Sequence, residues 1–141
     1  MSFAQTHAIS DVCVLCSDIE ASIRFYTETL GFSLLHRAPG FADFSGAGLT
    51  LALWERGHIH DNTGVAKASS STGLCIAVRL PDAATLDAVY AELAAKGAPF
   101  VGPPADYSWN AYCAYFTGPD GEVWEIYAWR EGGAVGALDK P

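Results

Sequence analysis

One strand-and-helix pattern occurs twice in this chain, at a constant spacing. Three pairs of positions correspond at a separation of 64 (75−11, 82−18, 90−26): Asp11 and Cys75, Asp18 and Asp82, Tyr26 and Tyr90. An internal repeat of this kind indicates that one supersecondary unit has been duplicated. Two copies of a curved half-sheet enclose a space that neither has alone, so the repeat also predicts where a functional cavity lies.

The composition is that of a folded protein without nucleic-acid affinity. Half of the 141 residues are hydrophobic and only 17% are charged, which leaves ample material for a core. The net charge is −8 with only eight Lys and Arg residues, whereas binding to nucleic-acid phosphates requires many cations. The acidic balance is compatible with a neutral or cationic small molecule.

The sequence offers no membrane or export signal. No apolar run approaches the ~20 residues that span a bilayer. The first residues, Met1 to His7, lack the basic and apolar blocks of a signal peptide. We therefore expect a cytoplasmic protein that does not bind membranes.

Two of the four cysteines, Cys13 and Cys16, have a spacing that occurs in redox and zinc sites. They lie within an apolar strand, however, and successive strand residues alternate between faces. Residues 13 and 16 therefore point to opposite sides and can neither pair nor share a metal. The same reasoning favours four reduced thiols, Cys13, Cys16, Cys75 and Cys113, which are mostly buried.

Module one is predicted over residues 8–55. It begins with a strand at 8–16 and a helix at about 18–30, for which Ser17 and Glu20 provide a capping box and Gly31 a stop. Strands follow at 33–38, 41–45 and 49–55. The small polar residues 56–72 are predicted to be a linker in which His58 and His60 belong to no regular element.

Module two is predicted over residues 73–129 and repeats this order. It has a strand at 73–80, a helix at 83–96, and strands at 99–102, 111–117 and 123–129, with residues 130–141 as a tail. Pro119-Asp120-Gly121 predicts the last hairpin turn. The fold class is therefore α+β, with two βαβββ modules in one domain spanning 1–141.

Two segments resemble a known family. Phe25-Tyr26, followed by Leu30-Gly31-Phe32, and the run from Pro119 to Ile126 are similar to motifs of the vicinal oxygen chelate superfamily. This superfamily includes glyoxalase I, extradiol dioxygenases and bleomycin-resistance proteins, and the resemblance covers roughly residues 8 to 129. It implies two modules related by a pseudo-twofold axis, curved mixed sheets around one cavity, and a homodimer.

The metal enzymes of this superfamily carry one ligand on each of four strands, usually His, Glu, His and Glu. The resemblance places Asp11, Ala52, Cys75 and Glu125 at these positions, so only Glu125 keeps the ligand type. Ala52 has no donor atom, and both imidazoles are missing. We therefore predict no metal and no other cofactor.

Strand alternation then predicts which side chains face the cavity. The expected ligand-binding residues are Asp11, Trp54, Cys75, Arg79, Trp109, Glu125 and Tyr127. The opposite faces should pack under the two helices; they carry Val12, Val14, Leu51, Leu53, Ile76, Val78, Trp124 and Ile126.

Each of these assignments has a plainer alternative. Arg79 and Glu125 can instead form an internal ion pair. Trp54 and Tyr127 can be core aromatics rather than surfaces on which a ligand stacks. The segment from Tyr107 to Asn110 is predicted to be a loop at the rim of the cavity.

Two main classes of function remain open, beside the weaker alternative of an inactive accessory domain. The first is metal-independent binding of a hydrophobic or aromatic small molecule, neutral or cationic, as in bleomycin-resistance-like sequestration. The second is an enzyme of the superfamily, a lyase, isomerase or oxygenase, that uses a shifted metal site or acid–base groups such as Glu125 with Asp11 or a nearby histidine. The sequence contains no nucleophile and base at a recognisable spacing, which favours the first class.

Overall fold

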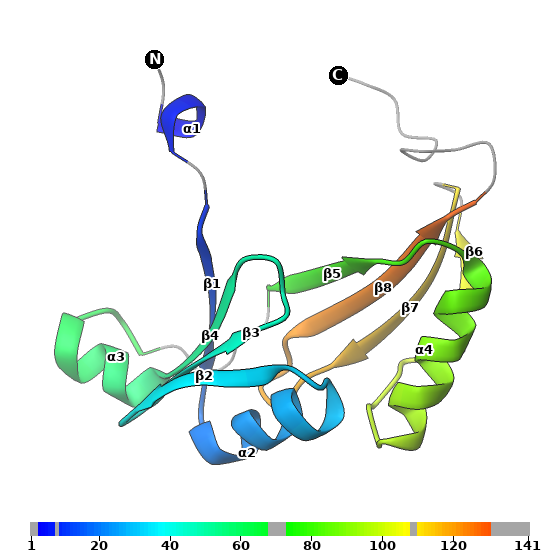
Figure 1. Ribbon diagram of the computed structural model, residues 1–141. Coiled ribbons are helices and arrows are strands. Elements are labelled where there is room, and N and C mark those ends of the chain that lie inside the picture. The colour runs from blue at the N-terminus through cyan, green and yellow to red at the C-terminus, as the bar shows by residue number, and fades with distance from the viewer. Residues whose placement is uncertain (1–2, 8, 68–72, 108–109, 131–141) are drawn as a thin grey trace. The chain divides into compact units, whose positions relative to one another are not determined.

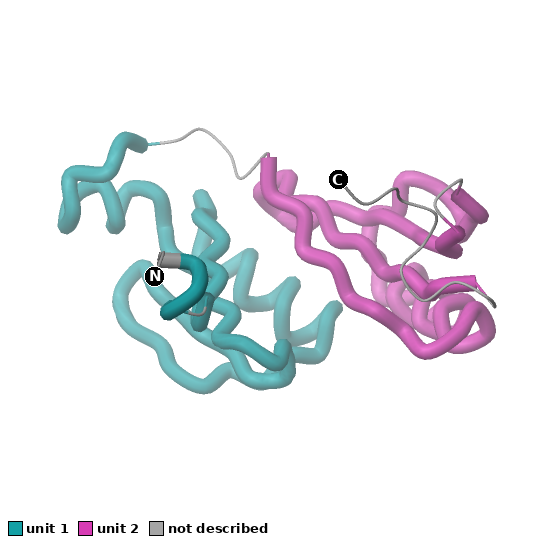
Figure 2. Tube along the Cα trace, turned by 90° about the horizontal axis from the view of Figure 1, so that it is seen from above, with its two compact units in different colours: residues 1–71 teal, residues 72–141 magenta. Residues whose placement is uncertain are grey.

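The computed structural model describes residues 3–7, 9–67, 73–107 and 110–130 (Figure 1). The chain separates into two compact units, residues 1–71 and 72–141 (Figure 2). Each unit contains one open four-stranded sheet with a helix packed on it.

The first unit has the sheet order β1-β4-β3-β2, with β1 parallel to β4 and the other neighbours antiparallel. Its elements are α1 (Phe3–Thr6), β1 (Asp11–Cys16), α2 (Ile19–Arg24), the π-helical turn η1 (Phe25–Thr29), β2 (Ser33–Ala38), β3 (Phe41–Ser45), β4 (Thr50–Glu55) and α3 (Arg56–Thr63).

The second unit repeats this topology with the order β5-β8-β7-β6, and β5 is parallel to β8. Its elements are β5 (Cys75–Arg79), α4 (Ala83–Ala95), β6 (Ala105–Tyr107), β7 (Ala111–Thr117) and β8 (Val123–Trp129). The predicted α+β class with two similar βαβββ modules is confirmed. That the two sheets enclose one cavity stays a prediction.

The two main helices begin in the same way. Asp18 caps α2 by accepting a hydrogen bond from the backbone N–H of Ala21 at 3.1 Å. Asp82 caps α4 by accepting from the N–H of Thr85 at 2.7 Å. The predicted capping box that begins at Ser17 is therefore wrong by one residue, because the N-cap is Asp18, whose carboxylate accepts the first-turn amide.

Each sheet has one face covered by its helix. Burial alternates along β1 and β8, where the helix-side positions are the more buried ones. On β4 the small side chain of Ala52 is buried together with the helix-side residues Leu51 and Leu53. In the first unit Tyr26 is fully buried and its ring lies 5.6 Å from that of Phe44. In the second unit the core joins residues of α4, β7 and β8: Leu86, Ala114, Ile126 and Ala128.

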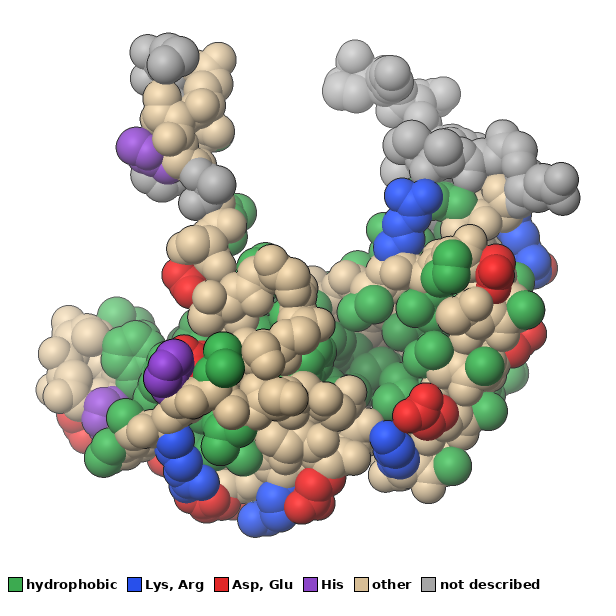
Figure 3. Space-filling model, in the orientation of Figure 1, with side chains coloured by type: hydrophobic (Ala, Val, Ile, Leu, Met, Phe, Trp, Pro, Cys, Tyr) green, Lys and Arg blue, Asp and Glu red, His purple; other side chains and the backbone are tan. Residues whose placement is uncertain are grey.

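One helix-side prediction is wrong. Val78, expected under α4, is 38% exposed. It lies on the edge strand β5, whereas α4 packs on β7 and β8. Hydrophobic side chains accordingly reach the visible surface of the second unit (Figure 3).

Three further predictions need correction. Residues 56–63 form α3 rather than an irregular linker, so His58 and His60 do belong to a regular element. Residues 99–102 form no strand; Phe100 makes a single bridge to Phe116, and β6 follows at Ala105–Tyr107. Pro103 and Pro104 lack the N–H donors that a strand ladder needs. Tyr107 therefore ends a strand instead of opening a loop.

Within the part of the chain that the structure describes, no helix is long and apolar enough to cross a membrane. Residues 68–72 of the predicted linker and 131–141 of the predicted tail lie outside the described residues.

Candidate functional site

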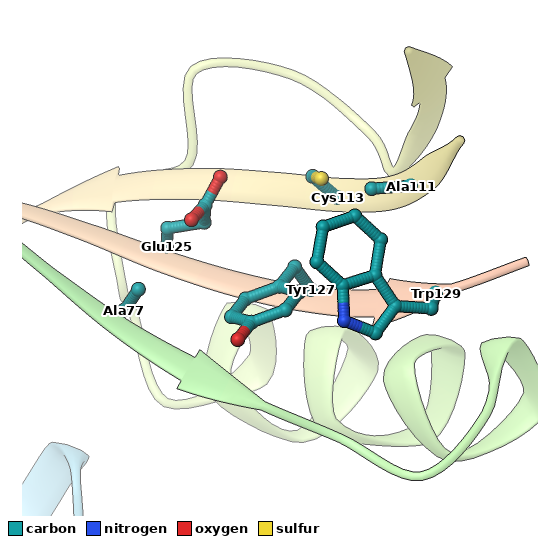
Figure 4. A pocket seen from close by; sticks show the side chains of 6 residues that line it. All are labelled: Ala77, Ala111, Cys113, Glu125, Tyr127 and Trp129. Atoms are coloured by element: carbon teal, nitrogen blue, oxygen red, sulfur yellow. The ribbon is translucent and has the colours of Figure 1, made fainter. Parts of the chain in front are cut away.

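A pocket of about 200 Å³ lies on the face of the second sheet that α4 does not cover. Figure 4 shows its lining side chains on one side of the strands, with α4 behind the sheet. We call it the second-unit pocket, and six residues line it: Ala77, Ala111, Cys113, Glu125, Tyr127 and Trp129.

Strand register brings these side chains together. Glu125 on β8 lies opposite Ala77 on β5 and Tyr115 on β7. Two residues further along β8, Tyr127 lies opposite Cys113. Directly paired residues point to the same face of a sheet, so the three strands present one continuous surface. The small side chains on β5 and β7 leave the space that the pocket occupies.

Glu125 is the only charged residue that lines this pocket. The phenol of Tyr115 donates a hydrogen bond to its Oε2 atom, while Oε1 accepts no bond from a described residue. Burial of the phenol, followed by the hydrogen bond and the negative charge of Glu125, raises the pKa of Tyr115 far above its usual range. Tyr115 thus remains a neutral donor, and one carboxylate oxygen is available to a ligand.

Two aromatic side chains, Tyr127 and Trp129, line the pocket together with this carboxylate. The rings of Tyr127 and Trp129 meet edge to face with centroids 5.5 Å apart. On the neighbouring strands, Tyr107 and Tyr115 pack in the same way at 5.9 Å. The edge-to-face contact of Tyr127 with Trp129 favours one relative orientation of the two rings that line the pocket.

The structure brings together part of the predicted binding set. Glu125 and Tyr127 line the pocket. Arg79 lies opposite Tyr127 and Cys75 opposite Val123, so both share this face of the sheet. Trp109 lies outside the described residues. Asp11 and Trp54 belong to the first unit, and their part in a common site stays a prediction.

The sequence reasoning missed four of the residues that build this site: Ala111, Cys113, Tyr115 and Trp129. All four have the parity of Glu125 once β7 and β8 are paired in register. Continuing the same alternation four residues beyond Glu125 identifies Trp129. The residues on β7 could be assigned to this face only from the pairing register of β7 with β8, which is not evident from the sequence.

The contacts of Glu125 also bear on the alternative of an internal ion pair with Arg79. Among the described residues its carboxylate is bound by Tyr115, and no ion pair joins it to Arg79. An internal ion pair would have neutralised the charge of the pocket. The tyrosine leaves that charge in place.

In the first unit, Trp54 is held by contacts with neighbouring side chains. The indole nitrogen of Trp54 donates a hydrogen bond to Nδ1 of His58 on α3 at 2.9 Å. The ring of Trp54 also meets that of Phe41 edge to face at 6.1 Å. Trp54 is therefore held within its own unit, and its hydrogen-bond donor is already used. Asp11 accepts a hydrogen bond from the hydroxyl of Ser10 at 2.6 Å.

The cysteines behave as strand alternation predicts. All four cysteines are among the described residues and none forms a disulfide; Cys13 is exposed and Cys16 is buried, so they face opposite sides. Partial desolvation and then the charge of Asp11 raise the pKa of Cys13 to about 11. Desolvation and then the charge of Glu125 also raise the pKa of Cys75. Both Cys13 and Cys75 are exposed, so the expectation of mostly buried thiols holds only for Cys16 and Cys113.

The residues at the superfamily's ligand positions do not fit a metal ion. Ala52 offers no donor atom, and Asp11 and Cys75 stand where the usual ligand set has its two imidazoles. Within the described part of the chain, no three His, Cys, Asp or Glu side chains are grouped so that they could hold a metal.

Two half-sheet modules with this strand order and an open, aromatic sheet face define a glyoxalase-like fold. The family model of the glyoxalase/bleomycin resistance protein/dioxygenase superfamily matches residues 8–126. The chain belongs to this superfamily, as the resemblance predicted.

Solved structures agree with this assignment. A glyoxalase/bleomycin resistance protein/dioxygenase from Nocardioides is 47% identical, with a TM-score of 0.87 over 94% of this chain and 90% of that one. A glyoxalase-related enzyme from Fulvimarina pelagi is 26% identical, with a TM-score of 0.76 over 94% and 97%.

A lactoylglutathione lyase from Agrobacterium tumefaciens is 18% identical, with a TM-score of 0.71 over 86% of this chain and 92% of that one. At this identity the similarity shows the fold alone. No curated protein matches the chain.

Proposed function

We propose that this protein binds a small aromatic molecule, preferentially a cation, in the second-unit pocket and without a metal. The observation that carries the proposal is the carboxylate of Glu125, which lies among aromatic rings with one oxygen unused by any described residue. Such a group orients a ligand by accepting its donor and attracts positive charge.

The size of the pocket limits the ligand. Sites for drug-sized molecules usually enclose about 300–1,000 Å³. The second-unit pocket, at about 200 Å³, is suited to one or two fused rings. The faces of Tyr127 and Trp129 offer the π-surface on which an aromatic cation gains attraction of about 0.5–2 kcal/mol.

Binding without chemistry is the form of this function that the residues support best. Tyr115 is held neutral with a raised pKa, so it does not accept protons at neutral pH. The thiol of Cys75 is likewise held protonated and is a poor nucleophile. The proposal therefore resembles bleomycin-resistance-like sequestration, carried out by a cytoplasmic homodimer.

Calorimetry with a matched pair of probes tests this function. The cation 1-methylquinolinium and neutral quinoline at pH 7.5 have similar ring systems and differ chiefly in charge. We expect wild-type protein to bind the cation about tenfold more tightly, which corresponds to about 1.4 kcal/mol. Glu125→Gln should abolish this preference and leave quinoline binding within about twofold, since the glutamine carbonyl still accepts from Tyr115.

Glu92→Gln is the control, because it removes one negative charge from the exposed face of α4, where Glu92 pairs with Lys96. This variant should keep the wild-type preference. Equal wild-type affinity for both probes, or a preference that survives Glu125→Gln, would contradict the proposed function.

A further inference from the structure

The first unit carries a second polar pair on its own sheet, formed by His36 on β2 and Asp43 on β3. Nδ1 of His36 lies 2.9 Å from Oδ1 and 3.2 Å from Oδ2 of Asp43. The backbone N–H of His36 also donates to Oδ1, at 2.9 Å. The carboxylate is thus fixed by two donors from one residue.

A break in strand register creates this pair. Leu34 lies opposite Phe44, but the next paired residues are His36 and Asp43, so Leu35 is the extra residue of a bulge. Without the bulge, Leu35 would lie opposite Asp43 and His36 would point to the other face. Bulges often redirect a side chain beside a functional site.

The pairing fixes the chemistry of the imidazole. A carboxylate only accepts, so Nδ1 of His36 carries a proton and the lone pair of the neutral ring is on Nε2. The Asp43 side chain is only 16% exposed, whereas that of His36 is 76% exposed. The carboxylate therefore lies on the shielded side of the ring, and the ring itself is open to solvent.

The same face offers a surface for a flat molecule. Asp43 lies opposite Ala52, which in turn lies opposite Cys13, so a small side chain adjoins the carboxylate. Phe41 and Trp54 lie on the same face, two residues further along these strands and therefore about 7 Å from Asp43 and Ala52. Their rings form an edge-to-face pair. Arg37, the next residue after His36, pairs with Glu20 of α2, on the opposite face.

We propose that His36 and Asp43 form a proton-accepting site for a planar molecule with an acidic hydroxyl group, such as a phenol or enol. The ring lies beside Phe41 and Trp54 and the hydroxyl donates to Nε2 of His36. Its O–H bond breaks as the N–H bond forms, which leaves an oxyanion beside an imidazolium paired with Asp43. This site belongs to the first unit and does not rest on the proposed function.

The probe is 4-nitrophenol, whose ionised form has its own absorption band. At about pH 6.5 the unbound dye is mostly protonated, while a large share of ordinary imidazoles is still neutral and can accept its proton. Under these conditions wild-type protein should raise the ionised fraction and quench tryptophan emission. His36→Gln should abolish the gain in ionised dye. Asp43→Asn should reduce the ratio of ionised to neutral dye at least fivefold, because it removes the anion that stabilises the imidazolium.

His60→Gln is the matched control, because His60 is exposed on α3 and its Nδ1 bonds only the backbone oxygen of Val65 among described groups. It should ionise the dye as wild type does. Circular dichroism and thermal melting of each variant establish that it is folded. Ionisation that survives His36→Gln, or that is lost in Glu125→Gln, would overturn the proposal, since the dye would then be ionised elsewhere.

Discussion

The two sheets of this protein share one topology and differ in the chemistry of their open faces. Cys13 and Ala77 are equivalent in the repeat (77−13 = 64), and their partners on the last strands are Ala52 and Glu125. On the third strand of each module, the partners of these two residues are Asp43 and Tyr115. The position that carries a carboxylate in the second unit therefore carries a methyl group in the first.

The difference shows which properties the scaffold determines. In both units a carboxylate on the open face is bound by a donor on a neighbouring strand, Tyr115 for Glu125 and His36 for Asp43. In the first unit the carboxylate, Asp43, lies on β3, whereas in the second unit Glu125 lies on the strand equivalent to β4. Topology fixes which positions share a face, while the residues at those positions determine the charge and hydrogen-bonding groups that the face presents.

The last two strands of each unit are joined by glycine-containing turns that differ in how tightly they pack. A Cβ atom at Gly118 would lie 2.3 Å from the carboxyl carbon of Glu122, whose side chain is fully buried. Oε1 of Glu122 also accepts the backbone N–H of Asp120 at 2.9 Å, so the carboxylate cannot move away. We expect Gly118→Ala to lower the free energy of unfolding by about 3 kcal/mol, measured in urea.

Gly48, in the corresponding turn of the first unit, is the control. It has a φ of +82° but no atom within 4 Å of an added Cβ. Gly48→Ala should cost only the strain of the left-handed conformation, about 1–2 kcal/mol. If the two variants are equally stable, the tight packing described for the second turn is incorrect.

The exposed thiols of the two sheets provide a second comparison. With a pKa of about 11, Cys13 should react with iodoacetamide at pH 8 about a hundredfold more slowly than an unstructured cysteine peptide. Its rate should rise about tenfold per pH unit up to pH 11, because a raised pKa delays formation of the thiolate. Site-resolved mass spectrometry measures both thiols.

Each thiol should respond only to the carboxylate of its own sheet. Asp11→Asn should accelerate Cys13 and leave Cys75 unchanged, whereas Glu125→Gln should do the reverse, since each carboxylate raises the pKa of its neighbouring thiol. Acceleration of both thiols by either variant would show that local charge is not the cause.

The smallest expected effect concerns the two indole rings. Trp54 donates to His58, whereas the indole nitrogen of Trp129 bonds no described residue. Trp54→Phe should therefore lower the free energy of unfolding by about 1 kcal/mol beyond the effect of Trp129→Phe, the usual net value of one hydrogen bond. Equal losses in thermal or urea unfolding would mean that the bond to His58 contributes nothing.

Much of the fold could be predicted from the repeat and from turn residues. The strands at 33–38, 41–45, 111–117 and 123–129 have the predicted bounds. The helix α3 was missed because its stability comes from tertiary contacts rather than from an apolar face. Arg56 is buried and donates to the backbone oxygen of Leu15 at 3.1 Å, and His58 accepts from Trp54.

The candidate site was only partly predictable for a related reason. Strand parity identified Glu125 and Tyr127, because it needs only the spacing along one strand. Tyr115 and Cys113 required the pairing of β7 with β8, and the pair of His36 with Asp43 required a bulge. Neither pairing register nor bulges are visible in the residues of a single strand.

The central claim is that the second unit alone binds an aromatic cation, through Glu125. The most direct measurement is a backbone amide NMR titration of the isotope-labelled protein with 1-methylquinolinium. The account predicts saturable shifts around Ala77, Cys113, Glu125 and Tyr127, which Glu125→Gln removes. Shifts confined to residues 9–67, or shifts that Glu125→Gln leaves unchanged, would contradict it.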